Sequence, residues 1–234
     1  MALVRPLWAA LLDLADERDC GGCGRPQPSG APLCASCAGL LAVSGPWRAL
    51  ASVPGAPRTY AVARYEDPVR TMLIVYKERG RCDLRRALGR GLARAVAATV
   101  DGAGARSSSP LALVPMPSRP RVVRERGEDT TARLARAAAR TLREAGVPAR
   151  AVPALRHSRA VLDQAGLTRE QRRANVAGAL RARRGGLAAA ACDVVLVDDI
   201  STSGASLAEA ARALRVAGVP VLGAATIAAA RVRA

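Results

Sequence analysis

The stretch VVLVDDISTSGAS, residues 194–206, constrains the fold of this chain more than any other segment. Four apolar residues that favour strands run into two adjacent acids, Asp198 and Asp199, and a short turn rich in hydroxyls and glycine follows. The next residues, LAEAARALRVAG, place apolar side chains at helical spacing. The sequence therefore predicts a buried strand, a short loop and a helix start in direct succession, as in an α/β fold with a mostly parallel sheet flanked by helices.

A loop of this kind can hold a phosphate. Backbone N–H groups at a helix N-terminus and the helix dipole both favour an anion. The two acids lie at the carboxyl end of the strand, where open α/β sheets bind their ligands. Carboxylates do not bind phosphate, but they accept hydrogen bonds from sugar hydroxyls or help to hold Mg²⁺. The sequence thus predicts a site for a phosphorylated ribose; a plain strand–turn–helix with a polar turn is the alternative. The predicted phosphate-binding residues are Ser201, Thr202, Ser203, Gly204, Ala205 and Ser206.

Four cysteines near the N-terminus form the pattern C-x2-C-x10-C-x2-C: Cys20, Cys23, Cys34 and Cys37. Two C-x-x-C pairs suit tetrahedral Zn²⁺ in a closed structural site. A segment of about 30 residues with few large apolar side chains lacks a core of its own, so a bound metal would supply its folding energy. Two disulfides in a secreted protein are the alternative. We expect structural zinc, because no secretory signal is evident.

The two motifs together resemble the ComF/GntX family, in which a small zinc ribbon precedes a type I phosphoribosyltransferase-like domain. Residues 194–206 look like the motif that binds phosphoribosyl diphosphate (PRPP) in such domains. Three further stretches fit the family pattern: RYEDPVRTMLIVYKERG at 64–80, LVPMPSRPRVVRERGED at 113–129 and QAGLTREQRRAN at 164–175. In the second stretch, Glu128 and Asp129 stand where the family usually has an apolar residue and an amide.

The resemblance implies a protein that binds PRPP with Mg²⁺ and is linked to natural competence, the uptake and use of external DNA, or to nucleotide salvage. If the protein is an enzyme, it displaces pyrophosphate from the anomeric carbon of the ribose. The alternatives are a DNA-uptake accessory that senses PRPP without catalysis and a nucleic-acid-binding regulator. We find no clear segment for recognising a nucleobase, which weighs against the enzyme.

The resemblance also implies roles for single residues. Asp198 and Asp199 would hold the ribose hydroxyls, and the loop at 115–119 would line the pyrophosphate. Lys77 or Arg126 would offset the charge of the leaving pyrophosphate. In the 115–119 loop, the predicted contacts are Pro117, Ser118 and Arg119.

Lys77 is the single lysine among 36 basic residues. Because arginine is tolerated at every other basic position, a lone lysine indicates that a planar guanidinium will not serve there. Survival by chance is the alternative. The sole histidine, His157, lies among arginines and is predicted to be a solvated surface residue.

The net charge of +17 favours anionic partners such as nucleic acid, anionic lipid and polyphosphates. Aromatic residues make up only 2% of the chain, so it lacks the stacking platform that sequence-tolerant binders of single strands use. A solvated arginine-rich surface and a weak contact with single-stranded DNA or the competence machinery therefore stay equally open. The oligomeric state is open as well.

The predicted organisation has four parts. These are an amphipathic lead-in helix at 1–17, the cysteine module at 18–44, a linker rich in proline and glycine at 45–59, and the phosphoribosyltransferase-like domain at 60–234. No apolar run is long enough to span a bilayer, and residues 1–16 lack a cleavage site, so we expect a cytoplasmic protein. In the last part, the predicted strands are 60–64, 111–114, a short one from 152, 194–197 and 221–227, and the predicted helices are 67–78, 84–100, 129–145 and 206–217.

Overall fold

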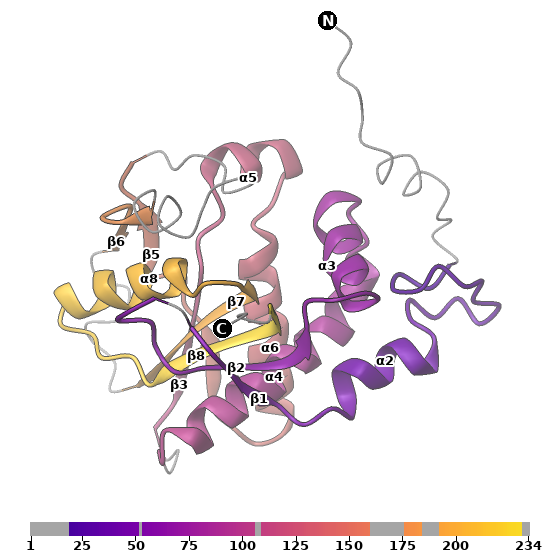
Figure 1. Ribbon diagram of the computed structural model, residues 1–234, viewed down its shortest axis with the longest axis horizontal. Coiled ribbons are helices and arrows are strands. Elements are labelled where there is room, and N and C mark those ends of the chain that lie inside the picture. The colour runs from indigo at the N-terminus through magenta and orange to yellow at the C-terminus, as the bar shows by residue number, and fades with distance from the viewer. Residues whose placement is uncertain (1–18, 52, 106–108, 160–175, 184–191, 231–234) are drawn as a thin grey trace, which may run out of the picture.

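The computed structural model describes residues 19–51, 53–105, 109–159, 176–183 and 192–230 (Figure 1). One sheet of six strands forms its centre. The strands in spatial order are β1 (Trp47–Ala49), β2 (Thr59–Arg64), β8 (Gly223–Ala229), β7 (Asp193–Ser201), β3 (Leu111–Pro115) and β4 (Ala149–Ala151). All neighbours pair in parallel except β1, which runs antiparallel to β2 at one edge. The predicted α/β class with a mostly parallel sheet is confirmed.

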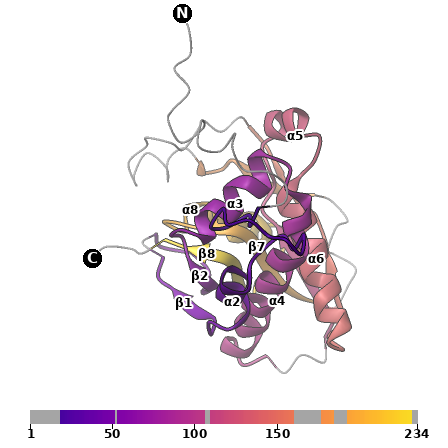
Figure 2. The same ribbon diagram turned by 90° about the vertical axis from the view of Figure 1, so that its right-hand side faces the viewer.

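Helices cover both faces of the sheet, as the two views in Figure 1 and Figure 2 show. One face carries α2 (Ala35–Ala42), α3 (Val69–Glu78), α4 (Arg85–Gly102) and α6 (Thr130–Glu144), and the other carries α8 (Ala205–Val216). Alternate residues of β7 pack into the apolar cores on the two faces of the sheet. Val195 and Val197 join the core under α4 and α6, whereas Val194 and Leu196 join the core under α8. Burial on both faces explains the unbroken apolar run of this strand.

After two neighbouring strands, β3 and β7, the chain crosses to opposite faces of the sheet. From β3 it passes through α6 to β4, and from β7 it passes through α8, on the other face, to β8. The carboxyl ends of β3 and β7 therefore flank a topological switch point, where the connecting loops part and leave a crevice. The acids follow the apolar run of β7, so the fold places them beside this crevice.

Several predicted boundaries were wrong. The segment predicted as a linker contributes β1, which pairs Trp47–Ala49 with β2. β7 was predicted to end at Val197, but parallel pairing with β8 continues to Ser201, so both acids lie within the strand. The short strand expected from Val152 is instead β4 followed by β5 (Leu155–His157), which pairs with β6 (Leu180–Ala182) in a separate antiparallel hairpin.

The other predicted strands and helices of the described chain exist within a few residues of the predicted bounds. A short helix, α5 (Pro120–Arg126), and a 3-10 turn, η1 (Cys82–Leu84), were not predicted. The predicted lead-in helix at 1–17 and the segment at 164–175 lie outside the described residues. In the described part of the chain, no helix combines the length and apolar character needed to cross a bilayer.

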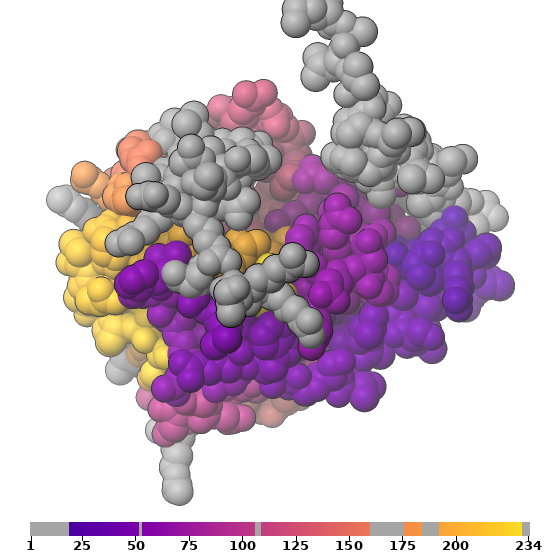
Figure 3. Space-filling view, viewed as in Figure 1, coloured from indigo at the N-terminus to yellow at the C-terminus, as the bar shows by residue number. Residues whose placement is uncertain are grey.

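The cysteine segment packs on the main body rather than forming a detached module. Figure 3 shows its indigo surface lying against the surface of α3 without a break. Cys20, Cys37 and Leu41 are each 2% exposed and belong to the same apolar core as Met72 and Leu84. The second C-x-x-C pair opens α2, with Cys34 as its N-cap, so the segment differs from a ribbon built of two hairpins.

Candidate functional site

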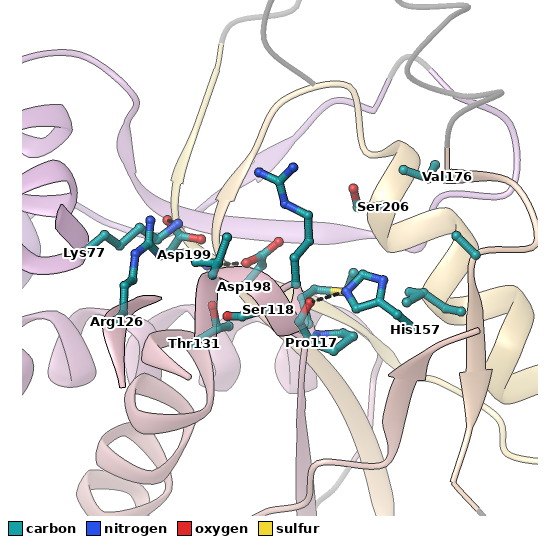
Figure 4. Close-up of a pocket in the computed structure, with 15 residues that line it drawn as sticks. Lys77, Pro117, Ser118, Arg126, Thr131, His157, Val176, Asp198, Asp199 and Ser206 are labelled. Atoms are coloured by element: carbon teal, nitrogen blue, oxygen red, sulfur yellow. Dashed lines mark hydrogen bonds and ion pairs between the residues drawn. The ribbon is translucent and has the colours of Figure 1, made fainter. Parts of the chain in front are cut away.

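A cavity of about 330 Å³ lies at the crevice between the carboxyl ends of β3 and β7. Figure 4 shows its side chains arriving from opposite sides: Lys77 and Arg126 lie on one side of the acids, and His157 lies on the other. A second cavity of about 280 Å³ adjoins it over the loop that follows β7, and the two share Lys77, Asp198, Asp199 and Ser206. The arrangement offers one polar site of two compartments.

The two acids point to different faces because neighbouring residues of a strand alternate. Asp199 continues the row of Val195 and Val197 toward α3, where its Oδ2 forms an ion pair with the Nζ of Lys77. The Lys77 side chain is 23% exposed and that of Asp199 is 5% exposed, so this pair is largely withdrawn from water. Asp198 lies on the α8 side, and its Oδ1 accepts a hydrogen bond of 2.9 Å from the backbone N–H of Asp199.

Burial and neighbouring charge give the two carboxyls different protonation behaviour. Burial raises the pKa of Asp198 well above its ordinary value, and the charge of Asp199 raises it further. Burial alone would also raise the pKa of Asp199, but the Lys77 ammonium holds that pKa below its ordinary value. Burial alone would lower the pKa of Lys77, whereas the two carboxylates raise it. Among the described residues, Asp198 is therefore the carboxyl of this pair that forms no ion pair.

We expect Asp198→Asn to stabilise the ligand-free protein at pH 7. The folded-state pKa of Asp198 lies above its unfolded value, so ionisation of this carboxyl opposes folding above the unfolded pKa, and that cost disappears as the pH falls below it. An amide of the same shape avoids the cost. Thermal unfolding followed by circular dichroism should show a gain of about 2–4 °C at pH 7, as expected for roughly 1 kcal/mol, and the gain should shrink toward pH 4.

The control for this experiment is Asp101→Asn, which changes an exposed carboxylate on α4. It should show no gain that depends on pH in this way. If Asp198→Asn were less stable than the wild type at pH 7, or if its gain were the same at every pH, the assigned environment of Asp198 would be wrong.

The loop after β7 is shaped by Gly204. Its φ of 80° lies in the left-handed region, and it is the N-cap of α8. A Cβ added there would lie 2.9 Å from the Cβ of Ala51, so the loop also needs glycine to pack against Ala51 and Ala56. Ser201 and Ser203 are buried, whereas Thr202 is exposed and Ser206 faces the cavity. The hydroxyls thus surround the loop rather than all pointing into it.

Asp129 fastens the loop after β3 to α6. Its Oδ1 accepts hydrogen bonds from the backbone N–H of Ala132 at 3.0 Å and from the Oγ of Ser118 at 2.9 Å, and its Oδ2 accepts one from the Ser118 N–H at 3.3 Å. Glu128 forms an ion pair of 2.5 Å with Arg133. Neither acid lines the cavity. These two acids, which depart from the family pattern, therefore serve the scaffold of the site.

The hairpin of β5 and β6 supplies a wall that was not predicted. His157 was expected on the surface, but it is partly buried, lines the cavity and donates from Nε2 to the carbonyl of Pro117 at 3.0 Å. Leu180 and Val176 add apolar surface on the same side. Glu209 of α8, which is 5% exposed, accepts the N–H of Leu180 at 3.0 Å and so ties the hairpin to the helix that follows the loop at 201–204.

Every residue predicted for the PRPP site lines one or both cavities. The larger cavity takes in Lys77, Pro117, Ser118, Arg119, Arg126, Asp198, Asp199 and Ser206, and the smaller one takes in the whole loop from Ser201 to Ser206. Thr131, Tyr65 and His157 also line them and were missed. His157 carried one usable signal, its being the only histidine in the chain. The roles assigned to these residues stay predictions.

The four cysteines converge on one point. All four are free thiols in the structure, and their sulfur atoms lie within 4.8 Å of one another. The sulfurs of Cys23 and Cys34 are 3.8 Å apart, which matches the edge of about 3.8 Å that a tetrahedron with metal–sulfur bonds of about 2.3 Å requires. A Cβ on Gly22 would lie 2.9 Å from the Cys37 sulfur, so the first pair needs its glycine. The cluster could hold a metal ion.

Backbone donors prepare one of these thiols for that role. Burial alone would raise the pKa of Cys20, but backbone N–H groups of Cys23, Cys34 and Gly22 lower it to about 6. The Cys34 N–H, for example, donates to the Cys20 sulfur at 3.3 Å. Thiolates are the form that binds metal, so these donors prepare Cys20 to act as a ligand.

Comparison with known proteins adds no relative to these observations. No protein-family model matches the chain, and a search of curated proteins finds no match. The resemblance to the ComF/GntX family therefore stays a prediction from the sequence motifs.

Proposed function

We propose that this protein binds phosphoribosyl diphosphate at the crevice between β3 and β7, as the ComF/GntX family to which its motifs are similar would imply. One observation carries the proposal: residues from α3, α5, β7 and the loops after β3 and β7 converge on a single pair of joined cavities. They combine two carboxylates for ribose hydroxyls, a hydroxyl-rich helix start for the 5′-phosphate and three cations for the pyrophosphate.

The binding mode follows from the two compartments. The smaller cavity over residues 201–206 would take the 5′-phosphate, and Asp198 and Asp199, which lie between the compartments, would accept hydrogen bonds from the ribose hydroxyls. The pyrophosphate would lie in the larger cavity against Ser118 and Arg119, with Lys77 and Arg126 opposite. Mg²⁺ bound with the pyrophosphate would be held mainly by phosphate oxygens and water, and Asp198 would be the carboxylate available to it.

The same geometry suits transfer of the phosphoribosyl group. A nucleophile seated against the hairpin wall would form a bond to the anomeric carbon, while the carbon–oxygen bond to pyrophosphate breaks and pyrophosphate leaves with the electron pair. The nucleophile's proton passes to the leaving group or to water. Lys77 and Arg126 would stabilise the charge that builds up on the leaving oxygen. The apolar wall of Val176 and Leu180 supports this enzymatic function over a sensor that only binds PRPP, because it offers a surface against which an acceptor could pack.

The test of the proposal has two parts. Titration calorimetry with PRPP and Mg²⁺ should show binding to one site per chain, and ribose 5-phosphate should compete. A mass-spectrometric screen of PRPP with mixed bases and amines should then reveal a product that depends on the protein. Binding without any product would favour the sensor, and failure to bind PRPP would refute both.

For the cysteine cluster we propose structural Zn²⁺. Four thiolates at tetrahedral spacing, with no open coordination position, suit this metal and leave it no catalytic role. The ion would join Cys20 and Cys23 to the helix that begins after Cys34, and so hold the segment on the core.

Lys77→Arg should impair PRPP binding nearly as much as Lys77→Ala. The ammonium fits between Asp199 and the cavity in a largely buried position, and Arg126 already occupies the neighbouring space. A guanidinium is broader and planar, so it cannot place one compact charge at that point. We expect a loss of about 10-fold or more in affinity by calorimetry for both variants, in line with one charge-assisted hydrogen bond.

Arg121→Lys, an exposed exchange on α5, is the matched control and should bind as the wild type does. Circular dichroism should confirm that all three variants fold. A Lys77→Arg variant with full affinity for PRPP would show that the site does not require lysine at this position.

A further inference from the structure

A groove lined by arginines runs along the seam between α4 and α6. Its cavity of about 670 Å³ shares no lining residue with the two cavities of the proposed ribose site. Figure 2 shows the two helices side by side on the same face of the sheet. The arginines that line the groove are Arg85, Arg86 and Arg90 of α4 and Arg133, Arg136 and Arg140 of α6.

Close helix packing brings the two rows of arginines together. A Cβ on Gly89 would lie 2.6 Å from the Cβ of Ala137, so α4 and α6 approach more closely than larger residues would allow. Arg86 and Arg90 flank the glycine on α4, and Arg136 precedes the alanine on α6. Like charges that converge in this way repel one another.

Acidic partners offset only part of this charge. Arg140 pairs with Glu144 at 2.8 Å, and Arg133 pairs with Glu128 at 2.5 Å. The remaining acid on the groove, Asp83, pairs with Arg81. Among the residues that the structure describes, no ion pair involves the other four arginines, which are Arg85, Arg86, Arg90 and Arg136. The groove therefore keeps a surplus of about four positive charges that an anionic ligand would neutralise.

The spacing of the charges fits a chain of phosphates better than a single one. At a rise of about 1.5 Å per residue, Arg85 and Arg90, two of these four arginines, lie about 7.5 Å apart along α4, and one strand of a duplex presents a phosphate about every 3.4 Å along its axis. The uncharged lining, Cys82, Ala137 and Thr141, contains no aromatic ring on which an unpaired base could stack. We propose that this groove binds the sugar–phosphate backbone of a double-stranded nucleic acid.

Fluorescence anisotropy of a labelled DNA duplex of about 20 base pairs tests the proposal, with the full chain and a salt series. Four phosphate contacts correspond to a slope of about −3.6 in the logarithmic salt plot, so the wild type should lose affinity about 100-fold between about 50 and 200 mM salt. The variant Arg86→Gln/Arg90→Gln/Arg136→Gln should lose only about 4-fold over that range, and should bind more weakly at low salt. An RNA duplex has the same backbone charge and should respond to the substitutions in the same way.

The matched control is Arg48→Gln/Arg150→Gln/Arg215→Gln, which lowers the net charge from +17 by the same three units at exposed positions outside the groove. It should keep the slope of the wild type. An equal effect of both triple variants would contradict binding at the groove, since affinity would then depend on the net charge of the protein and not on the position of the arginines. Tighter binding of the single strand, or of inorganic polyphosphate, would overturn the duplex as the ligand.

The groove and the proposed ribose site can fail separately. The groove variant should bind PRPP as the wild type does, which also shows that it folds. The variant Asp198→Asn/Asp199→Asn should still bind the duplex. Loss of duplex binding in that variant would contradict a separate groove.

Discussion

Replacing both acids of β7, as Asp198→Asn/Asp199→Asn, should reduce the affinity for PRPP by at least about 100-fold. Each carboxylate is expected to accept hydrogen bonds from ribose hydroxyls worth about 1.5–3 kcal/mol, and the two losses together exceed the 2.7 kcal/mol or so that 100-fold requires. The change also removes the anion that faces Lys77, so the ammonium is free to shift from its position. Titration calorimetry with PRPP and Mg²⁺ measures the effect.

The double variant should still fold, because the amides keep the shape of the side chains, and removal of the unfavourable Asp198 charge offsets part of the stability lost with the Asp199–Lys77 pair. The variant Asp101→Asn/Glu144→Gln removes the same two charges from exposed positions and should bind PRPP normally. Unchanged affinity in the double variant of β7 would remove the site assignment.

Loss of the metal should destabilise the whole protein strongly. Purified protein should contain about one zinc per chain by elemental analysis, and Cys34→Ser should lower the unfolding temperature by about 10 °C, because loss of a ligand weakens a site that supplies folding free energy. The effect should reach beyond the cysteine segment, since Cys20 and Cys37 are packed in the main core with Met72.

Cys82→Ser provides the comparison, because Cys82 is an exposed free thiol outside the cluster. It should melt with the wild type, and added chelator should lower the unfolding temperature of both. Two intact disulfides in metal-free protein, or equal melting of the Cys34 and Cys82 variants, would contradict the zinc site.

Patterns among neighbouring residues in the sequence were sufficient to predict β7 and α8. The apolar run before Asp198 predicted a buried strand, and the spacing that follows predicted α8, because both patterns depend on neighbours in sequence. The end of β7 was predicted too early, since its last residues are held by parallel pairing with β8, and no local pattern reports such pairing. β1 was missed for the same reason: its three residues become a strand only through β2.

Site residues that belong to a motif in one continuous stretch were predicted. Site residues that only the fold brings to the cavity, from distant parts of the sequence, were missed. Asp199 and Lys77 were both singled out, but their ion pair could not be derived, because it joins residues that the fold alone brings together. His157 was misjudged because its surroundings in sequence are charged, whereas in space it faces Pro117 and the cavity. A short polar strand gives no sign that it will form a wall.

The ion pair of Lys77 has one more consequence, for chemical labelling. Apart from the amino terminus of the chain, the ε-amine of Lys77 is the only amine that an acylating reagent can modify. Such reagents need the neutral amine, and the two carboxylates keep this one protonated by raising its pKa. The rate of acylation at this position therefore reports how firmly the acids hold the lysine, and a single mass shift follows the state of the whole site.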